Sequence, residues 1–360
     1  MRRRSLLSLL AATVLVAACS GGGDDAADTT AGSTTTSAAP DTTAGSSVPD
    51  TTTEASTSTT EPDGPVYPLT GLPVTDSAAA ARPALVVKID NNKAARPQNG
   101  LNEADIVFEE IVEVQTRFAA VFHSQGSDPV GPIRSGRTQD IDLLGSFDKP
   151  LFAWSGGNKN VTRAIQNSDL VDLSALKNTV HEAGGFFRSN DRKSPHNLYA
   201  ATSKLWTLAP EGAQPPPQQF QYLGQGDEAP GEQASGVTGE MDGLAVGWAF
   251  DAATGLYART SAGQPHLDAT SGQQVTTANV IVMTVKYRPS PADRRSPEAQ
   301  TIGSGEVMVF TGGHLVRGTW TRPDRLSPIM LTDESGAPIL LTPGRTFVEL
   351  ARKGTFTPVP

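Results

Sequence analysis

Arginines at the ends of predicted elements are the residues of this sequence best suited to chemistry. Arg134 and Arg137 flank a Ser-Gly turn that precedes a predicted helix over 138–144. Two guanidinium groups beside the free N–H groups of a helix start suit a phosphate or a carboxylate. Asp140 could hold one of the two guanidinium groups in place. The pattern predicts an anion-binding site.

The same arginines could instead belong to a structural network of ion pairs. Glu109 and Glu113 are an even number of residues apart, so a strand would place both on one face, and a helix would do the same. Arg134 and Arg137 could pair with these glutamates or with Asp140 and stiffen the domain. Ionic clusters occur both in ligand sites and in structural networks, so the sequence leaves both interpretations open.

Segment 188–199 adds a second group of polar residues on one predicted loop. His196 lies between a proline and Asn197, an arrangement that could orient the imidazole as an acid or a base, although a structural histidine is the alternative. We predict no specific catalytic residue. The predicted ligand-binding residues are Asp90, Arg96, Glu109, Glu113, Arg117, Arg134, Arg137, Asp140, Arg188, Arg192, His196 and Asn197.

Known catalytic patterns are weak or missing in the sequence. Residues 174–177 match the SxxK pattern of penicillin-binding enzymes, but no KTG motif follows in the required place. There is no GxSxG, HExxH or P-loop motif. The five histidines are dispersed and the chain has a single cysteine, so we predict no metal and no cofactor. The formal net charge of −9 argues against nucleic acid as a partner.

The first 65 residues predict export and a lipid anchor. Three arginines precede an apolar run over 6–18 that is too short to span a bilayer, which indicates a signal peptide over 1–18. The run ends in Val-Ala-Ala-Cys, resembling a bacterial lipobox whose cysteine, Cys19, is acylated. Residues 19–65 predict a disordered Thr/Ser/Asp tether with a reach of about 40 Å. We expect the protein to be lipid-anchored at the outer face of the cytoplasmic membrane.

The rest of the chain predicts an α+β fold in two parts. Strands over 84–89 and 151–154, a strand pair or one helix over 106–122, and helices over 159–166 and 200–208 indicate a mixed α/β N-terminal domain over 66–208. Residues 209–240, rich in Pro, Gln and Gly, read as a linker. A smaller antiparallel β-rich domain over 241–360 follows, with strands over 280–287, 305–310, 314–320, 329–332, 338–342 and 346–351.

Short motifs in a fixed order carry a family resemblance. They are PLTGLP at 68–73, IDN at 89–91, ARPQNGL at 95–101, ADIV at 104–107, TRF at 116–118, VGPIRSGR at 130–137, RKSPHNLY at 192–199, GTW at 318–320 and PGRT at 343–346. Over residues 66–355 the chain resembles the YerB-like lipoproteins, exported Gram-positive proteins with a two-part domain of unknown function. The resemblance implies a lipid anchor, an α/β N-terminal domain and a β-rich C-terminal domain, but no reaction. Val114-Gln115 stand where the family usually has glycines.

Two classes of function are consistent with these observations. The first, which we favour, is a binding or accessory module for an anionic envelope component or a wall-synthesis protein. The alternative is an envelope phosphotransferase or hydrolase, in which Arg134 and Arg137 clamp an anion and Asp140 or Glu109 acts as base. A faint likeness to the LytR-CpsA-Psr phosphotransferases supports this alternative. No nucleophile with an evident base is visible, which favours the binding module.

Overall fold

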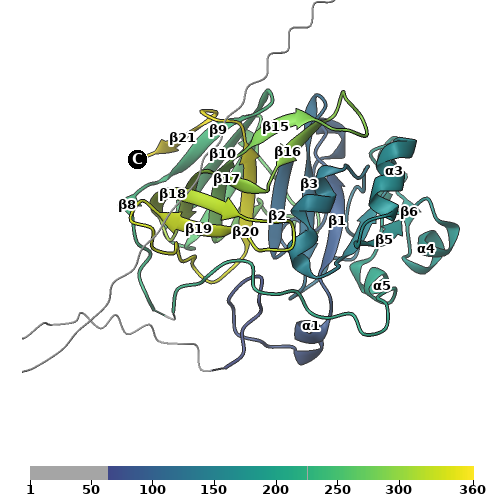
Figure 1. Cartoon of the computed structure of the whole chain (residues 1–360), viewed down its shortest axis with the longest axis horizontal. Coiled ribbons are helices and arrows are strands. Elements are labelled where there is room, and N and C mark those ends of the chain that lie inside the picture. The colour runs from purple at the N-terminus through teal and green to yellow at the C-terminus, as the bar shows by residue number, and fades with distance from the viewer. Residues whose placement is uncertain (1–63, 225) are drawn as a thin grey trace, which may run out of the picture. The chain divides into compact units, whose positions relative to one another are not determined.

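A computed structural model describes residues 64–224 and 226–360. The predicted signal peptide over 1–18, the lipidation site Cys19 and nearly all of the tether over 19–65 therefore lie outside the described residues. Among the residues described, no helix is long and apolar enough to cross a bilayer. The ribbon in Figure 1 shows a broad twisted sheet with helices gathered beside the strands of the N-terminal part.

Three buried strands form the centre of the N-terminal part. They are β1 (Leu85–Asp90), β2 (Ile106–Val112) and β3 (Gln115–Phe122). β3 pairs antiparallel with both β1 and β2, which confirms the strand pair and not the single helix over 106–122. β4 (Leu151–Trp154) and β5 (Val171–Ser174) continue the sheet parallel to β1. Apolar residues that are β-branched or aromatic favour strands buried on both faces.

Short helices cover the N-terminal part. They are α1 (Ser77–Ala81), α2 (Gln139–Leu143), α3 (Lys159–Gln166), α4 (Asn178–Ala183) and α5 (Thr202–Trp206), with 3-10 turns η1 (Lys93–Ala95) and η2 (Gly145–Phe147). In α3, Val161 and Ile165 lie one turn apart and are both buried, and the Asn158 side chain caps the helix start. The three helices predicted at 138–144, 159–166 and 200–208 are all present.

The C-terminal part extends the same sheet. Its strands here are β14 (Asn279–Thr284), β17 (Gly303–Thr311), β18 (His314–Arg322), β19 (Met330–Asp333), β20 (Thr346–Ala351) and, beside β18, β8 (Glu232–Gln233). β14, β17, β18 and β19 pair antiparallel, as expected. β20 differs, because it runs parallel to β14 and to β2 (Figure 1). One sheet therefore passes through both parts of the chain.

A second, antiparallel sheet packs against the first. It consists of β12 (Gln264–Pro265), β11 (Leu256–Ser261), β10 (Leu244–Asp251), β9 (Gly236–Met241) and β21 (Phe356–Val359), with β13 (Thr276–Thr277) on β11. Trp248 of β10 contacts Phe347 of β20, with ring centroids 4.8 Å apart. Contacts of this kind make one core between the two sheets.

Two small hairpins and one irregular segment complete the fold. The hairpins are β6 (Phe187–Arg188) with β7 (Leu198–Tyr199), and β15 (Lys286–Pro289) with β16 (Pro297–Gln300). The strand predicted over 338–342 is absent, because this segment makes single bridges only. Within segment 209–240, Phe220 and Leu223 are buried, and the Leu223 N–H donates to the Leu341 carbonyl at 2.8 Å.

Alternation along β1 and β3 separates two faces of the main sheet. Leu85, Val87 and Phe118 face the second sheet, whereas Val86 and Val121 face α2 and α3. We call these the sheet face and the helix face. Where β1 ends, each face carries a group of polar side chains, and the two groups contact different residues.

Candidate functional site

The candidate site lies where β1 and β4 end. These two strands are parallel, so their carboxyl ends meet at one edge of the sheet, which is where open sheets of this kind bind ligands. Segment 134–137 crosses this edge, since the Arg134 N–H donates to the Lys88 carbonyl at 2.8 Å and the Ser155 N–H donates to the Arg134 carbonyl at 2.9 Å. The turn between β2 and β3 lies at the same edge.

Arg117 is the most unusual residue at this edge. It lies opposite Asp90 in the β1–β3 register and is 2% exposed. Within the part of the chain that the structure describes, it forms no ion pair, and its Nε and Nη1 have no hydrogen-bond acceptor. Burial, and next the charges of Arg137 and Arg134, lower the pKa of Arg117 to about 10. Arg117 therefore carries a buried charge with no ion-pair partner among the described residues, although Asp90 and Glu113 partly offset its cost.

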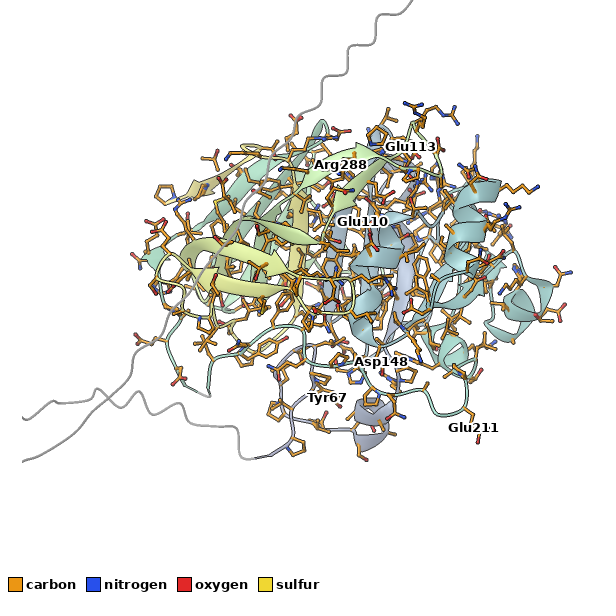
Figure 2. All side chains as sticks on the ribbon, viewed as in Figure 1. Tyr67, Glu110, Glu113, Asp148, Glu211 and Arg288 are labelled. Atoms are coloured by element: carbon orange, nitrogen blue, oxygen red, sulfur yellow. The ribbon has the colours of Figure 1, made fainter. Side chains whose placement is uncertain are left out.

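Arg134 and Arg137 complete an arginine cluster with Arg117. Arg134 Nε lies 3.1 Å from Asp90 Oδ2, and Arg137 Nη2 donates to both carboxylate oxygens of Glu113 at 2.9 and 2.8 Å. In Figure 2 Glu113 lies at the upper end of β2 and β3. Three guanidinium groups thus face two carboxylates, so the arginine cluster keeps a net positive charge.

Asp90 also holds a histidine at this edge. His196 Nδ1 lies 2.6 Å from Asp90 Oδ2, and the His196 side chain is 20% exposed. In the described residues, its Nε2 has no hydrogen-bond partner. An imidazole oriented by a carboxylate in this way can exchange a proton with a bound molecule. The arrangement can therefore bind an oxyanion through the arginine cluster and present a proton-exchanging group beside it.

Asp140 was predicted to hold a guanidinium group, but it contacts the backbone of the arginine cluster instead. Its Oδ2 accepts the backbone N–H of Arg137 at 2.6 Å, and its Oδ1 lies 2.5 Å from Lys88 Nζ, so it does not hold a guanidinium group. Lys88 Nζ also lies 2.5 Å from Glu110, to which Gln139 donates. Burial, and next the charge of Asp140, raise the pKa of Glu110 to about 8. The ammonium group of Lys88 thus balances the charge of Asp140, and the Glu110 carboxyl keeps its proton.

Glu109 lies on the sheet face, away from the arginine cluster. Its Oε1 accepts from Asn91 Nδ2 at 2.9 Å, and its Oε2 pairs with buried Arg259. The prediction that Glu109 and Glu113 share a face was wrong, because β2 ends at Val112 and Glu113 belongs to the turn, with a φ of 30°. Arg96 also lies away from the cluster and donates to the side chain and carbonyl of Asn91.

The remaining predicted residues hold the loop over 188–199 in place. Arg188 Nη1 donates to Asn197 Oδ1 at 2.8 Å, and Asn197 Nδ2 donates to the Ser189 carbonyl at 2.8 Å. Arg192 donates to two backbone carbonyls of segment 95–97. These contacts position His196 over Asp90. The site thus depends on Arg188, Arg192 and Asn197 because they hold this loop, and with it His196, in position.

Sequence reasoning missed the buried charged residues behind the site. Lys88, Glu110, Arg259 and Glu349 are all fully buried in strands. The available signal was a charged residue inside a mainly apolar strand, as Lys88 in Leu-Val-Val-Lys-Ile-Asp of β1. Among the residues described, no three His, Cys, Asp or Glu side chains lie together as metal ligands would.

Comparison with known proteins matches both parts of the chain to one family. Residues 69–214 match "Protein of unknown function (DUF3048) N-terminal domain", and residues 238–348 match the corresponding C-terminal domain. The Bacillus subtilis (strain 168) protein "Putative lipoprotein YerB" is 29% identical over 299 residues, which cover 79% of this chain and 85% of the relative.

The fold is also similar to a solved structure. The crystal structure of the YerB protein from Bacillus subtilis superposes with a TM-score of 0.70 at 23% identity, covering 81% of this chain and 99% of that chain. The comparison confirms the α+β fold and its two-part organisation. Together, the two matched domains and the relative show that this chain belongs to the two-part DUF3048 family of YerB-like lipoproteins.

Proposed function

We propose that this lipoprotein is anchored through Cys19 at the outer face of the cytoplasmic membrane and that its folded part binds an anionic component of the cell envelope through the arginine cluster. The bound group would be a phosphate or a carboxylate, because three guanidinium groups at one edge match the oxygens of either group. The tether over 19–65 would supply the reach between the membrane and the wall.

The observation that supports this proposal is the unpaired charge of Arg117. A guanidinium group buried without a direct ion pair and with unsatisfied N–H groups is costly, and a purely structural network would give it a partner. Arg134 and Arg137 stand beside it and raise this cost further. An anionic ligand would offset the repulsion among all three side chains, which accounts for a charge kept in this place.

A calorimetric titration with poly(glycerol phosphate), pyrophosphate and a phosphate-free wall glycan tests the proposal. We expect the two phosphate compounds to bind and Arg117→Gln to weaken that binding at least tenfold. Arg317→Gln is the matched control, because Arg317 is an exposed arginine of β18 whose ion pair with Glu232 is also exposed. Equal binding by wild type and Arg117→Gln would contradict the proposal, and no phosphate binding at all would rule out a phosphate as the bound group.

The pairing of His196 with Asp90 supports a second candidate function, an envelope phosphotransferase or hydrolase. In that case the arginine cluster would stabilise charge on a transferring phosphoryl group, while His196 would donate or accept the proton. Release of phosphate or of glycerol phosphate from the polymer, lost in His196→Gln while binding persists, would favour the enzyme. Binding without turnover by the wild type would favour the binding module.

A further inference from the structure

A separate pocket lies on the sheet face of the same edge. It has a volume of about 720 Å³, within the range of small-molecule sites, and segments 91–97, 114–116, 242–244 and 261–267 contribute to its wall. No member of the arginine cluster lines it. The pocket opens between the turns of the main sheet and those of the second sheet, so both parts of the chain build it.

Much of the pocket wall is apolar. Leu244, Pro97 and Pro265 contribute to it, and Val114 and Leu267 are 89% and 46% exposed. Large apolar side chains grouped at the surface beside a pocket mark a place where an apolar partner binds. An apolar body would therefore remove these side chains from water.

The charged residues of the pocket wall are mainly basic. Lys93 and Arg96 both line it, and within the described residues neither forms an ion pair. Within segments 64–224 and 226–360, Arg96 donates to the side chain and carbonyl of Asn91, both uncharged. Asp242 is the carboxylate among the lining residues, and Arg352 Nε lies 3.4 Å from it. The wall therefore offers two unneutralised positive charges to a bound molecule.

The buried charged residues behind the pocket wall, which contact the lining residues Asn91 and His266, carry no net charge. Arg259 lies between Glu109 and Glu349, and burial together with the charge of Glu109 raises the pKa of Glu349 to about 8. His266 is neutral, because burial and Arg259 hold its pKa well below the ordinary value. These buried residues therefore do not cancel the positive charge of Lys93 and Arg96.

One polar group inside the pocket has no partner. The Ser261 hydroxyl is buried at 5% exposure and, in the described residues, makes no hydrogen bond. A buried hydroxyl left without a partner costs free energy that a polar atom of a bound molecule would recover. His266 cannot form a hydrogen bond with the Ser261 hydroxyl, since its two ring nitrogens already bond to Arg259 and Gln98.

We propose that this pocket binds a single-chain anionic amphiphile. Its apolar body would lie against Val114, Leu244 and Leu267, and its phosphate or carboxylate would lie at Lys93 and Arg96. The charge of these two residues excludes a cationic amphiphile, and the apolar wall disfavours a head group alone. The proposal is independent of the arginine cluster, which faces the opposite side of the sheet.

Thermal unfolding and calorimetry with dodecyl phosphate, below the concentration at which it forms micelles, test the proposal on the full folded protein. Dodecyltrimethylammonium and inorganic phosphate serve as charge and head-group controls. We expect dodecyl phosphate to raise the melting temperature and the other two to leave it within error. Lys93→Glu and Leu267→Asp should each weaken dodecyl phosphate binding at least tenfold.

Matched variants separate this site from the rest of the surface. Lys159→Glu and Leu326→Asp change an exposed lysine and an exposed leucine outside the pocket, and both should bind like the wild type. Equal response to the cationic amphiphile, or wild-type binding by Lys93→Glu and Leu267→Asp, would overturn the proposal. Loss of dodecyl phosphate binding in Arg117→Gln, with Lys93→Glu unaffected, would assign the amphiphile to the arginine cluster and would also overturn it.

Discussion

Replacing Arg117 with methionine should stabilise the protein in the absence of ligand and abolish anion binding. Methionine has a similar length and fits the same space without a charge. Burial and the neighbouring arginines lower the pKa of Arg117 from its ordinary value to about 10. At 1.36 kcal/mol for each pKa unit, the charged form is disfavoured by about 3 kcal/mol in the folded state. Since Arg117 is charged at pH 7 in both the folded and the unfolded chain, this cost applies in full at that pH.

Urea unfolding of wild type and Arg117→Met, with and without pyrophosphate, measures both effects. We expect the free energy of unfolding without ligand to rise by about 1–3 kcal/mol, because the gain is reduced by imperfect packing of methionine. Pyrophosphate should stabilise the wild type and leave the variant unchanged. A variant destabilised by about 3–5 kcal/mol would show that Arg117 has a structural partner and would refute the reasoning.

Three other outcomes can be checked separately. Cys19→Ala should move the protein out of the membrane fraction or leave the precursor unprocessed; detergent-dependent membrane association that persists would argue against acylation. Limited proteolysis should cut the tether and then the mainly exposed segment 211–215. The two resulting fragments should still elute together because β2 pairs with β20, and separate elution would contradict this. The free energy of unfolding should fall as pH rises from about 5 to about 8, because Glu110 and Glu349 keep protons in the folded chain that the unfolded chain has lost. Glu110→Gln should make this fall less steep. An unchanged slope in that variant would show that Glu110 is ionised in the folded chain.

Many of the local elements could be predicted from the sequence, and so could the position of the candidate arginines at element ends. Runs such as 84–89 and 116–122 have the composition of buried strands, and the turn residues around Arg134 and Arg137 mark an element end. The pairing of Asp90 with His196 was not predicted, although both residues were candidates, because nothing in their spacing brings them together. Sequence alternation also assigned Glu113 to a strand that ends one residue earlier.

Pairings between distant segments are what the sequence could not provide. Lys88 meets Glu110 and Asp140, which lie 22 and 52 positions away, and Arg259 meets Glu109 at a separation of 150. β20 is buried on both faces, so its side-chain pattern carries no signal of which strand it joins or in which direction. The pocket on the sheet face depends on the same distant pairings, and no motif marked it.

The pairing of β2 with β20 constrains how the molecule is made. Ile106 pairs with Thr346, which lies far later in the sequence, so the middle of the sheet cannot close until β20 has been synthesised. Until then β2 presents a bare edge to which other chains can add. Non-local pairing of this kind slows folding and prolongs exposure to aggregation. A chain cut short anywhere before β20 would therefore be a substrate for chaperones and proteases, so that truncated copies are removed and do not persist as partly working halves.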